Sequence, residues 1–178
     1  MLFRSRDDLR FAQRLLADEA TGLLLRTDVL DAQGRTLESS AFTEVQIGGN
    51  ADAKAVLEGM NPPGYKLLPS SRESVDWAAH GWGLRQAVPG FDLMGCVQRP
   101  LVAGQGEGHA LQAMFSDGVN FVSLFIEPFS DRHHRGALSA GMGATHTVMQ
   151  RVGDHWITAM GDVPGRTLER FVAALERR

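Results

Sequence analysis

A chain of 178 residues is long enough for one domain of ordinary size or for two small ones. Hydrophobic residues make up 43% of the sequence and charged residues 22%, a composition that is typical of globular proteins and excludes a wholly disordered chain. The net charge of -3 at pH 7 argues against a general nucleic-acid binder, which would present a basic field to the phosphates.

The sequence as written shows no membrane-spanning or export segment. No apolar run approaches the ~18 residues that cross a bilayer, and the first residues lack the apolar core of a signal peptide. Cys96 is the only cysteine, which excludes an intramolecular disulfide. Because it lies in an apolar stretch, we expect an unreactive, buried thiol.

Residues 1–48 read as a β-meander. Turn signals at Thr21-Gly22 and Gln33-Gly34 separate strands expected over 22–30 and 35–47. Residues 9–17 fit both a helical and an alternating pattern, and we favour a strand. Such a meander buries too little surface to be stable alone, so it requires another sheet or further sequence.

Residues 49–76 have the composition of a linker with one short helix. The helix is expected over 52–60, with Asn50 as its N-cap and Gly59 near its end. The following Asn61-Pro-Pro-Gly64 prevents regular structure, and the remainder is rich in proline, serine and charged residues.

Residues 77–178 predict a small α+β domain, an antiparallel sheet of about five strands capped by a C-terminal helix. Strands are expected over 91–98, 109–116, 119–126, 145–152 and 155–160, with an irregular crossover over 128–142. Pro164 suits a first helical turn, and Leu168, Phe171, Val172 and Leu175 then recur at helical spacing.

The central hairpin of this domain has a predicted register. Asp117-Gly118 is typical of a two-residue type I′ turn, which would pair Ser116 with Val119. One face of the hairpin is then apolar and predicts the core: Leu111, Ala113, Phe115, Val122, Leu124 and Ile126.

The other face of the hairpin is only half polar, although a solvated face would be polar throughout. Its apolar residues could pack against another domain or contact a partner protein. The nearby arginines could be solvated, or could bind an acidic peptide or an anionic lipid head group. The residues of the predicted partner-binding surface are Met114, Phe121, Phe125, Arg99, Arg132 and Arg135.

The sequence predicts no catalytic, cofactor or metal site. His146 and His155 flank the last hairpin and would lie roughly 20 Å apart at about 3.3 Å per residue. His133 and His134 are adjacent and read as solvated loop residues without a second zinc-ligand pair. The glycine-rich run at 104–108 is followed by a predicted strand, whereas a phosphate loop requires a helix.

Three stretches of the C-terminal part each combine turn residues with an apolar strand. They are Val88-Pro-Gly-Phe-Asp-Leu, Phe115-Ser-Asp-Gly-Val-Asn-Phe-Val-Ser-Leu-Phe-Ile-Glu127 and Val152-Gly-Asp-His-Trp-Ile-Thr-Ala-Met-Gly-Asp-Val-Pro-Gly. They resemble the small C-terminal domain of the MucB/RseB family, regulators of the sigma-E envelope-stress response. Upstream, Asp18-Glu-Ala-Thr-Gly-Leu-Leu-Leu-Arg-Thr-Asp-Val-Leu-Asp31 is similar to the last hairpin of that family's large, lipoprotein-carrier-like domain.

This resemblance implies a non-enzymatic periplasmic protein that binds the periplasmic part of a membrane-bound anti-sigma factor and shields it from regulatory proteolysis. In the full-length family, lipopolysaccharide or a lipid is implied as the releasing signal. Family members have a signal peptide and a complete carrier-like domain, so we expect this chain to be N-terminally incomplete, with 1–48 as a remnant of a half-barrel. The competing interpretation is a lipid- or lipoprotein-binding carrier module, which requires a large apolar cavity. Monomer and homo-oligomer both remain open.

Overall fold

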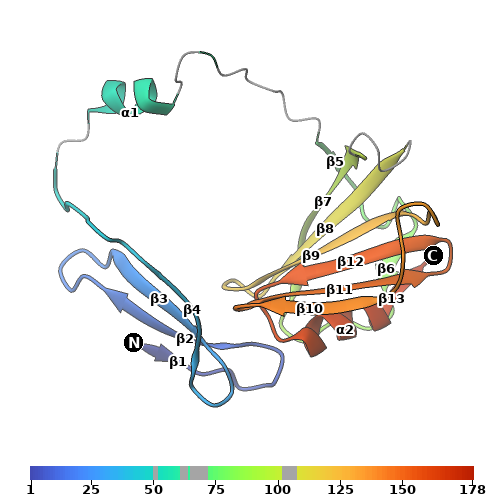
Figure 1. Ribbon diagram of the computed structural model, residues 1–178, viewed down its shortest axis with the longest axis horizontal. Helices are drawn as coiled ribbons and strands as arrows, with labels where there is room; N and C mark the ends of the chain where they lie inside the picture. The colour runs from blue at the N-terminus through green and yellow to red at the C-terminus, as the bar shows by residue number, and fades with distance from the viewer. Residues whose placement is uncertain (50–51, 61–63, 65–71, 102–107) are drawn as a thin grey trace.

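The computed structural model describes residues 1–178 except 50–51, 61–63, 65–71 and 102–107 (Figure 1). The described strands form a four-stranded sheet near the N-terminus, a seven-stranded sheet and a small two-stranded sheet. Asn50, the expected helix N-cap, and most of the glycine-rich run at 104–108 lie outside the described residues.

The N-terminal sheet is the predicted meander. Its antiparallel strands are β1 (Leu2–Phe3), β2 (Ala12–Ala17), β3 (Leu24–Leu30) and β4 (Thr36–Ala41), so the ambiguous segment contains a strand. The strand predicted over 35–47 is too long, since β4 ends at Ala41. Ala41 pairs with Arg26, and β3 begins two residues before Arg26, at Leu24. Residues beyond 43 therefore extend past the end of β3.

A buried carboxylate ties this sheet together. Asp28 on β3 is almost completely buried and binds the guanidinium groups of Arg14 at 2.7 Å and Arg26 at 2.8 Å. Ser39, Arg26 and Arg14 hold the pKa of Asp28 well below its usual range. The charge of Asp28 is therefore paired, as burial of a carboxylate requires.

The segment between the two sheets contains the expected helix, α1 (Ala53–Met60). Asp52 precedes it and accepts a hydrogen bond from the Lys54 backbone N–H at 2.9 Å. Further on, β5 (Glu73–Val75) pairs with the large sheet, so the last residues of the predicted linker belong to that sheet.

All five predicted C-terminal strands are present as β7 (Asp92–Pro100), β8 (His109–Ser116), β9 (Phe121–Pro128), β11 (Thr145–Val152) and β12 (His155–Gly161). The sheet order is β10-β11-β12-β9-β8-β7-β5, with β5 and β10 (Leu138–Met142) as edge strands (Figure 1). The prediction of an irregular crossover over 128–142 is therefore wrong for β10. Its Leu-Ser-Ala-Gly-Met sequence has no β-branched or aromatic residue to signal a strand.

The predicted register of the central hairpin is also wrong. Ser116 pairs with Phe121 instead of Val119, so the loop spans residues 117–120. This difference amounts to an even number of residues and leaves each side chain on its predicted face. Phe115 therefore lies on the core side as predicted, although it pairs with Val122 instead of Asn120.

The longer loop follows from the chemistry of Asp117. A type I′ turn requires positive φ at both central residues, and among the described residues positive φ occurs only at glycines such as Gly118. The Asp117 carboxylate instead accepts hydrogen bonds from the backbone N–H groups of Val119 at 3.0 Å and Asn120 at 2.7 Å. These bonds stabilise the four-residue loop.

The helix α2 (Gly165–Ala174) covers one face of the large sheet and forms the core with it (Figure 1). Leu168, Phe171 and Val172 are buried as predicted. Leu175 is also buried, but it begins β13 (Leu175–Arg177), which pairs with β6 (Trp82–Leu84). Sheet residues of the core are Cys96, Ala113, Phe115, Val122, Leu124, Ile126, Val148, Ile157 and Ala159.

Cys96 is buried, and burial followed by the charge of Asp76 raises the pKa of its thiol. Because thiolate is the reactive form, we expect the native protein to react with a disulfide reagent at least about 100-fold more slowly than the unfolded protein. Titration with Ellman's reagent, with and without denaturant, measures the ratio. Equal rates would contradict this placement of Cys96.

Candidate partner-binding surface

The large sheet has an outer face, defined here as the face opposite α2. Met114 on β8 and Phe121 and Phe125 on β9 lie on it, since strand residues alternate between faces. Phe121 remains 52% exposed and Met114 38% exposed. The structure thus brings together the three apolar residues of the predicted surface.

Arg99 joins these residues from β7. Its guanidinium carbon lies 4.9 Å from the ring centroid of Phe125, which is a cation–π contact. Arg132 and Arg135 are exposed in the loop after β9, and within the described residues no hydrogen bond, ion pair or cation–π contact joins them to the other four. Four of the six predicted residues therefore form one surface.

The apolar character of the outer face continues toward β10. Met160 on β12 pairs with Ser123 and is exposed, and Met149 on β11 pairs with Leu138. Leu138 and Met142 are 53% and 85% exposed. An exposed apolar band of this kind is typical of an interaction surface.

The loop after β9 covers one end of the outer face. His134 stacks on Trp156 with centroids 4.8 Å apart, and its Nε2 lies 3.1 Å from a Glu127 carboxylate oxygen. Its Nδ1 accepts the Ser130 backbone N–H at 2.9 Å. The prediction of a solvated His134 is therefore wrong, because this aromatic partner comes from a strand more than twenty positions away.

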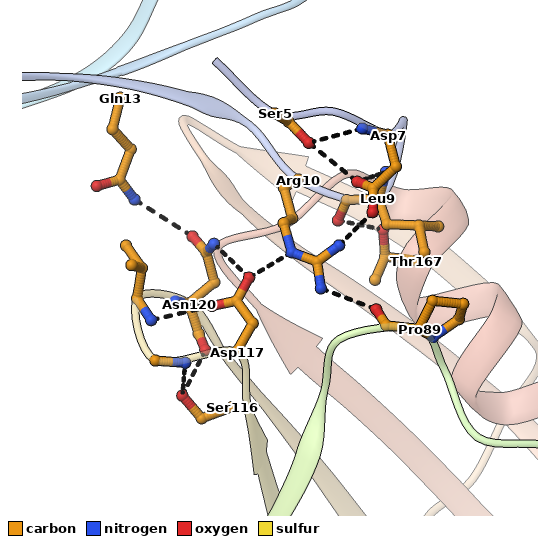
Figure 2. A network of polar contacts seen from close by, with 12 residues as sticks. Ser5, Asp7, Leu9, Arg10, Gln13, Pro89, Ser116, Asp117, Asn120 and Thr167 are labelled. Carbon is orange, nitrogen blue, oxygen red and sulfur yellow. Dashed lines mark hydrogen bonds and ion pairs between the residues drawn. The ribbon is translucent and has the colours of Figure 1, made fainter. Parts of the chain in front are cut away.

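Segment 5–11, which precedes β2, connects the N-terminal sheet to the large sheet, as Figure 2 shows. Arg10 donates a hydrogen bond to Asp117 at 2.5 Å, another to the Pro89 carbonyl at 2.8 Å, and also pairs with Asp7. One arginine thus links segment 5–11, the turn before β7 and the loop between β8 and β9.

Apolar and neutral contacts reinforce this junction. Leu9 is buried within the core of the large sheet, and its carbonyl accepts the Thr167 hydroxyl hydrogen at 2.8 Å (Figure 2). Gln13 also donates to the Asn120 side chain at 3.3 Å. Sequence patterns do not predict the junction, because Arg10 and Asp117 are 107 positions apart. The only local signal is an apolar residue, Leu9, among charged residues.

A cleft of about 800 Å³ lies between the two parts of the chain. Phe11 of segment 5–11 and Leu37 on β4 line one side of it, and Gly143 in the turn after β10 and His146 on β11 line the other. The ring centroids of Phe11 and His146 are 5.8 Å apart. The lining also contains charged residues of both signs: Arg4, Arg10, Arg35, Arg166, Asp7, Asp8 and Asp31.

The remaining histidines stand apart. His146 pairs with Gly161 and His155 with Val152, which places them at opposite ends of their hairpin as predicted. Burial, followed by the charge of Arg177, lowers the pKa of His155.

Within the described ranges, no group of three or more possible ligands could hold a metal ion. Neither described helix is long and apolar enough to cross a membrane.

A sheet with one face closed by a helix and with apolar side chains exposed on the other face is typical of a binding module. Comparison with family models identifies the module. The MucB/RseB C-terminal domain matches residues 76–176, and the MucB/RseB N-terminal domain matches residues 1–60. The chain belongs to the MucB/RseB family.

Curated relatives have regulatory names. The chain is 28% identical over 179 residues to "Sigma-E factor regulatory protein RseB" of Haemophilus influenzae, covering 97% of this chain and 53% of the relative. It is also 28% identical over 174 residues to "Sigma factor AlgU regulatory protein MucB" of Pseudomonas aeruginosa, covering 96% and 53%. The chain therefore spans about half the length of these relatives.

Solved structures share the fold. "Crystal structure of MucB in complex with MucA(peri)" superposes with a TM-score of 0.76 at 23% identity, covering 99% of this chain and 61% of that one. "Crystal structure of MucB" superposes with a TM-score of 0.65 at 22% identity, covering 97% and 55%. The arrangement of strands is thus that of known MucB structures.

Proposed function

We propose that this chain is a periplasmic binding protein without catalytic activity, which captures the periplasmic part of a membrane-bound anti-sigma factor and shields it from proteolysis. The regulatory names of its relatives and the MucB–MucA(peri) complex support this function. The observation that supports it most directly is the exposed apolar outer face, which lies opposite the face that α2 covers.

The outer face is suited to a flexible segment that becomes ordered on binding. Phe121 and Phe125 provide large aromatic surfaces, and Met114 is an adaptable neighbour. Arg99, held over Phe125, adds a positive charge that would pair with an acidic residue of the partner. Arg132 and Arg135 would extend this charge from the adjacent loop. A bound segment is inaccessible to a protease because cleavage requires an extended, free backbone.

Calorimetric titration with the periplasmic part of the anti-sigma factor encoded by the source organism tests this function. We expect the wild-type chain to bind in the micromolar range or tighter, and Phe121→Ser with Phe125→Ser to weaken binding by about tenfold or more. Both rings are buried in the proposed complex, so their loss removes apolar contact area.

The matched control is Leu57→Ser, which removes an exposed apolar side chain on α1 and should leave affinity unchanged. Unchanged affinity of a folded Phe121→Ser/Phe125→Ser variant would place the binding surface elsewhere. No binding by a folded wild-type chain would reject capture by this chain.

A lipid-carrier function finds less support. The cleft of about 800 Å³ is large enough for a small ligand, but four arginines and three aspartates are among its lining residues. Lipid chains require an apolar lining, because they leave buried charges without hydrogen-bond partners.

A further inference from the structure

The methionines of this protein are concentrated on the large sheet. Five of the seven lie on its strands, namely Met94, Met114, Met142, Met149 and Met160. A methionine usually fills a gap in a core, but all of these except Met149 are exposed. Their thioether side chains are therefore accessible to small reagents in the solvent.

Two of these methionines flank the centre of the outer face. Ser123 on β9 pairs with Met114 on β8 at one side and with Met160 on β12 at the other. The three residues form one row across neighbouring strands, so the two methionine Cα atoms lie about 10 Å apart. Phe121 and Phe125 lie on the same face, two positions before and after Ser123 along β9. Ser123 is thus surrounded by four large apolar side chains.

The thioether group has a defined reaction with peroxides. The methionine sulfur attacks one oxygen of hydrogen peroxide, the O–O bond breaks and an S–O bond forms. Sulfur loses two electrons, and the peroxide is reduced to water. The product, methionine sulfoxide, is a polar side chain with a strong hydrogen-bond acceptor, and dedicated reductases convert it back to methionine. Cys96, the other sulfur side chain of this sheet, is buried.

We propose that Met114 and Met160 are an oxidation site that controls partner capture, so that conversion of both side chains to sulfoxides weakens binding. This inference rests on the proposed function of the outer face. A partner that covers the rings of Phe121 and Phe125 must also cover the two methionines, because each pairs directly with the serine between the rings.

The sheet offers a buried sulfoxide little compensation. β8, β9 and β12 are interior strands, with a neighbouring strand on both sides. Their backbone N–H groups are therefore used within the sheet. A sulfoxide oxygen beneath a bound partner would lose its water without gaining a backbone donor, and this desolvation opposes binding. An oxidant in the envelope would in this way return the anti-sigma segment to the protease.

Oxidation of the full chain with hydrogen peroxide, followed by calorimetric titration with the periplasmic part of the anti-sigma factor, tests this proposal. Peptide mapping by mass spectrometry identifies the sulfoxides, and circular dichroism establishes that each oxidised protein is folded. We expect oxidation to weaken binding by the wild-type chain by about tenfold or more. Treatment with a pair of methionine sulfoxide reductases, one for each sulfoxide epimer, should restore the affinity.

Two double variants locate the effect. Met114→Leu/Met160→Leu keeps apolar side chains that peroxide does not oxidise, so its affinities before and after treatment should be equal, whatever the starting value. Met60→Leu/Met142→Leu is the matched control, because it removes the same number of exposed methionines at α1 and at the end of β10. This control should lose as much affinity on oxidation as the wild-type chain.

The outcomes separate this proposal from the proposed function. Binding that is unchanged after mapped oxidation of Met114 and Met160 would overturn the redox control and leave capture intact. The same conclusion would follow if the two residues stayed unmodified while Met142 was oxidised, or if Met114→Leu/Met160→Leu lost as much affinity as the wild type. Absence of binding before oxidation would reject the proposed function, and the redox control with it.

Discussion

Phe171→Ala is expected to lower the free energy of unfolding by about 3–5 kcal/mol. Phe171 on α2 has no exposed surface and contacts two further rings. Its centroid lies 5.4 Å from that of Phe91 in an edge-on arrangement and 5.0 Å from that of Phe115. Truncation would leave a cavity between the helix and the sheet in addition to removing apolar burial.

Urea denaturation of both proteins measures this difference. Phe42→Ala is the matched control, because it makes the same chemical change at a ring that is 57% exposed, and it should change stability by less than about 0.5 kcal/mol. Equal effects of the two substitutions would show that α2 does not close the core.

Periodic segments made most of the C-terminal fold predictable. The spacing of Leu168, Phe171 and Val172 on α2 and the alternation along β8 and β9 depend only on local geometry. Alternation alone also predicts that Met114, Phe121 and Phe125 lie on one face. An error in loop length that moves a strand by an even number of residues does not change this result.

The features that sequence reasoning missed depend on contacts between distant segments. β10 lacks strand-forming residues and exists because the hairpin at Gly143 pairs it with β11. His134 looked solvated because its stacking partner Trp156 lies on another strand. Arg132 and Arg135 lie in a loop without periodicity, so their positions relative to Arg99 could not be derived from spacing.

The outer face and the β10 edge have one physical property in common. Both leave apolar side chains exposed on a sheet whose other face is closed by α2.

Asp117→Ala is expected to lower the free energy of unfolding by about 2–4 kcal/mol at pH 7. The Asp117 side chain is only 6% exposed and forms an ion pair with Arg10. It also accepts hydrogen bonds from the backbone N–H groups of Val119 and Asn120. Its removal would leave these donors unpaired and would loosen the contact between the loop and segment 5–11. Asp117→Asn, which keeps the shape and one acceptor oxygen, should have a smaller effect.

The effect of Asp117→Ala should depend on pH in a defined direction. Burial raises the pKa of Asp117, but the hydrogen bonds from Asn120, Val119 and Arg10 outweigh burial and hold this pKa below its usual value. Since the folded state then binds the proton more weakly than the unfolded state, the stabilisation is present above about pH 4 and is lost as the pH falls through the folded pKa. Urea denaturation at pH 7 and at about pH 3 should therefore show a smaller difference between wild type and variant at the lower pH. A difference that is the same at both pH values would mean that the charge of Asp117 does not stabilise the junction, and that its hydrogen bonds to the loop account for the whole effect.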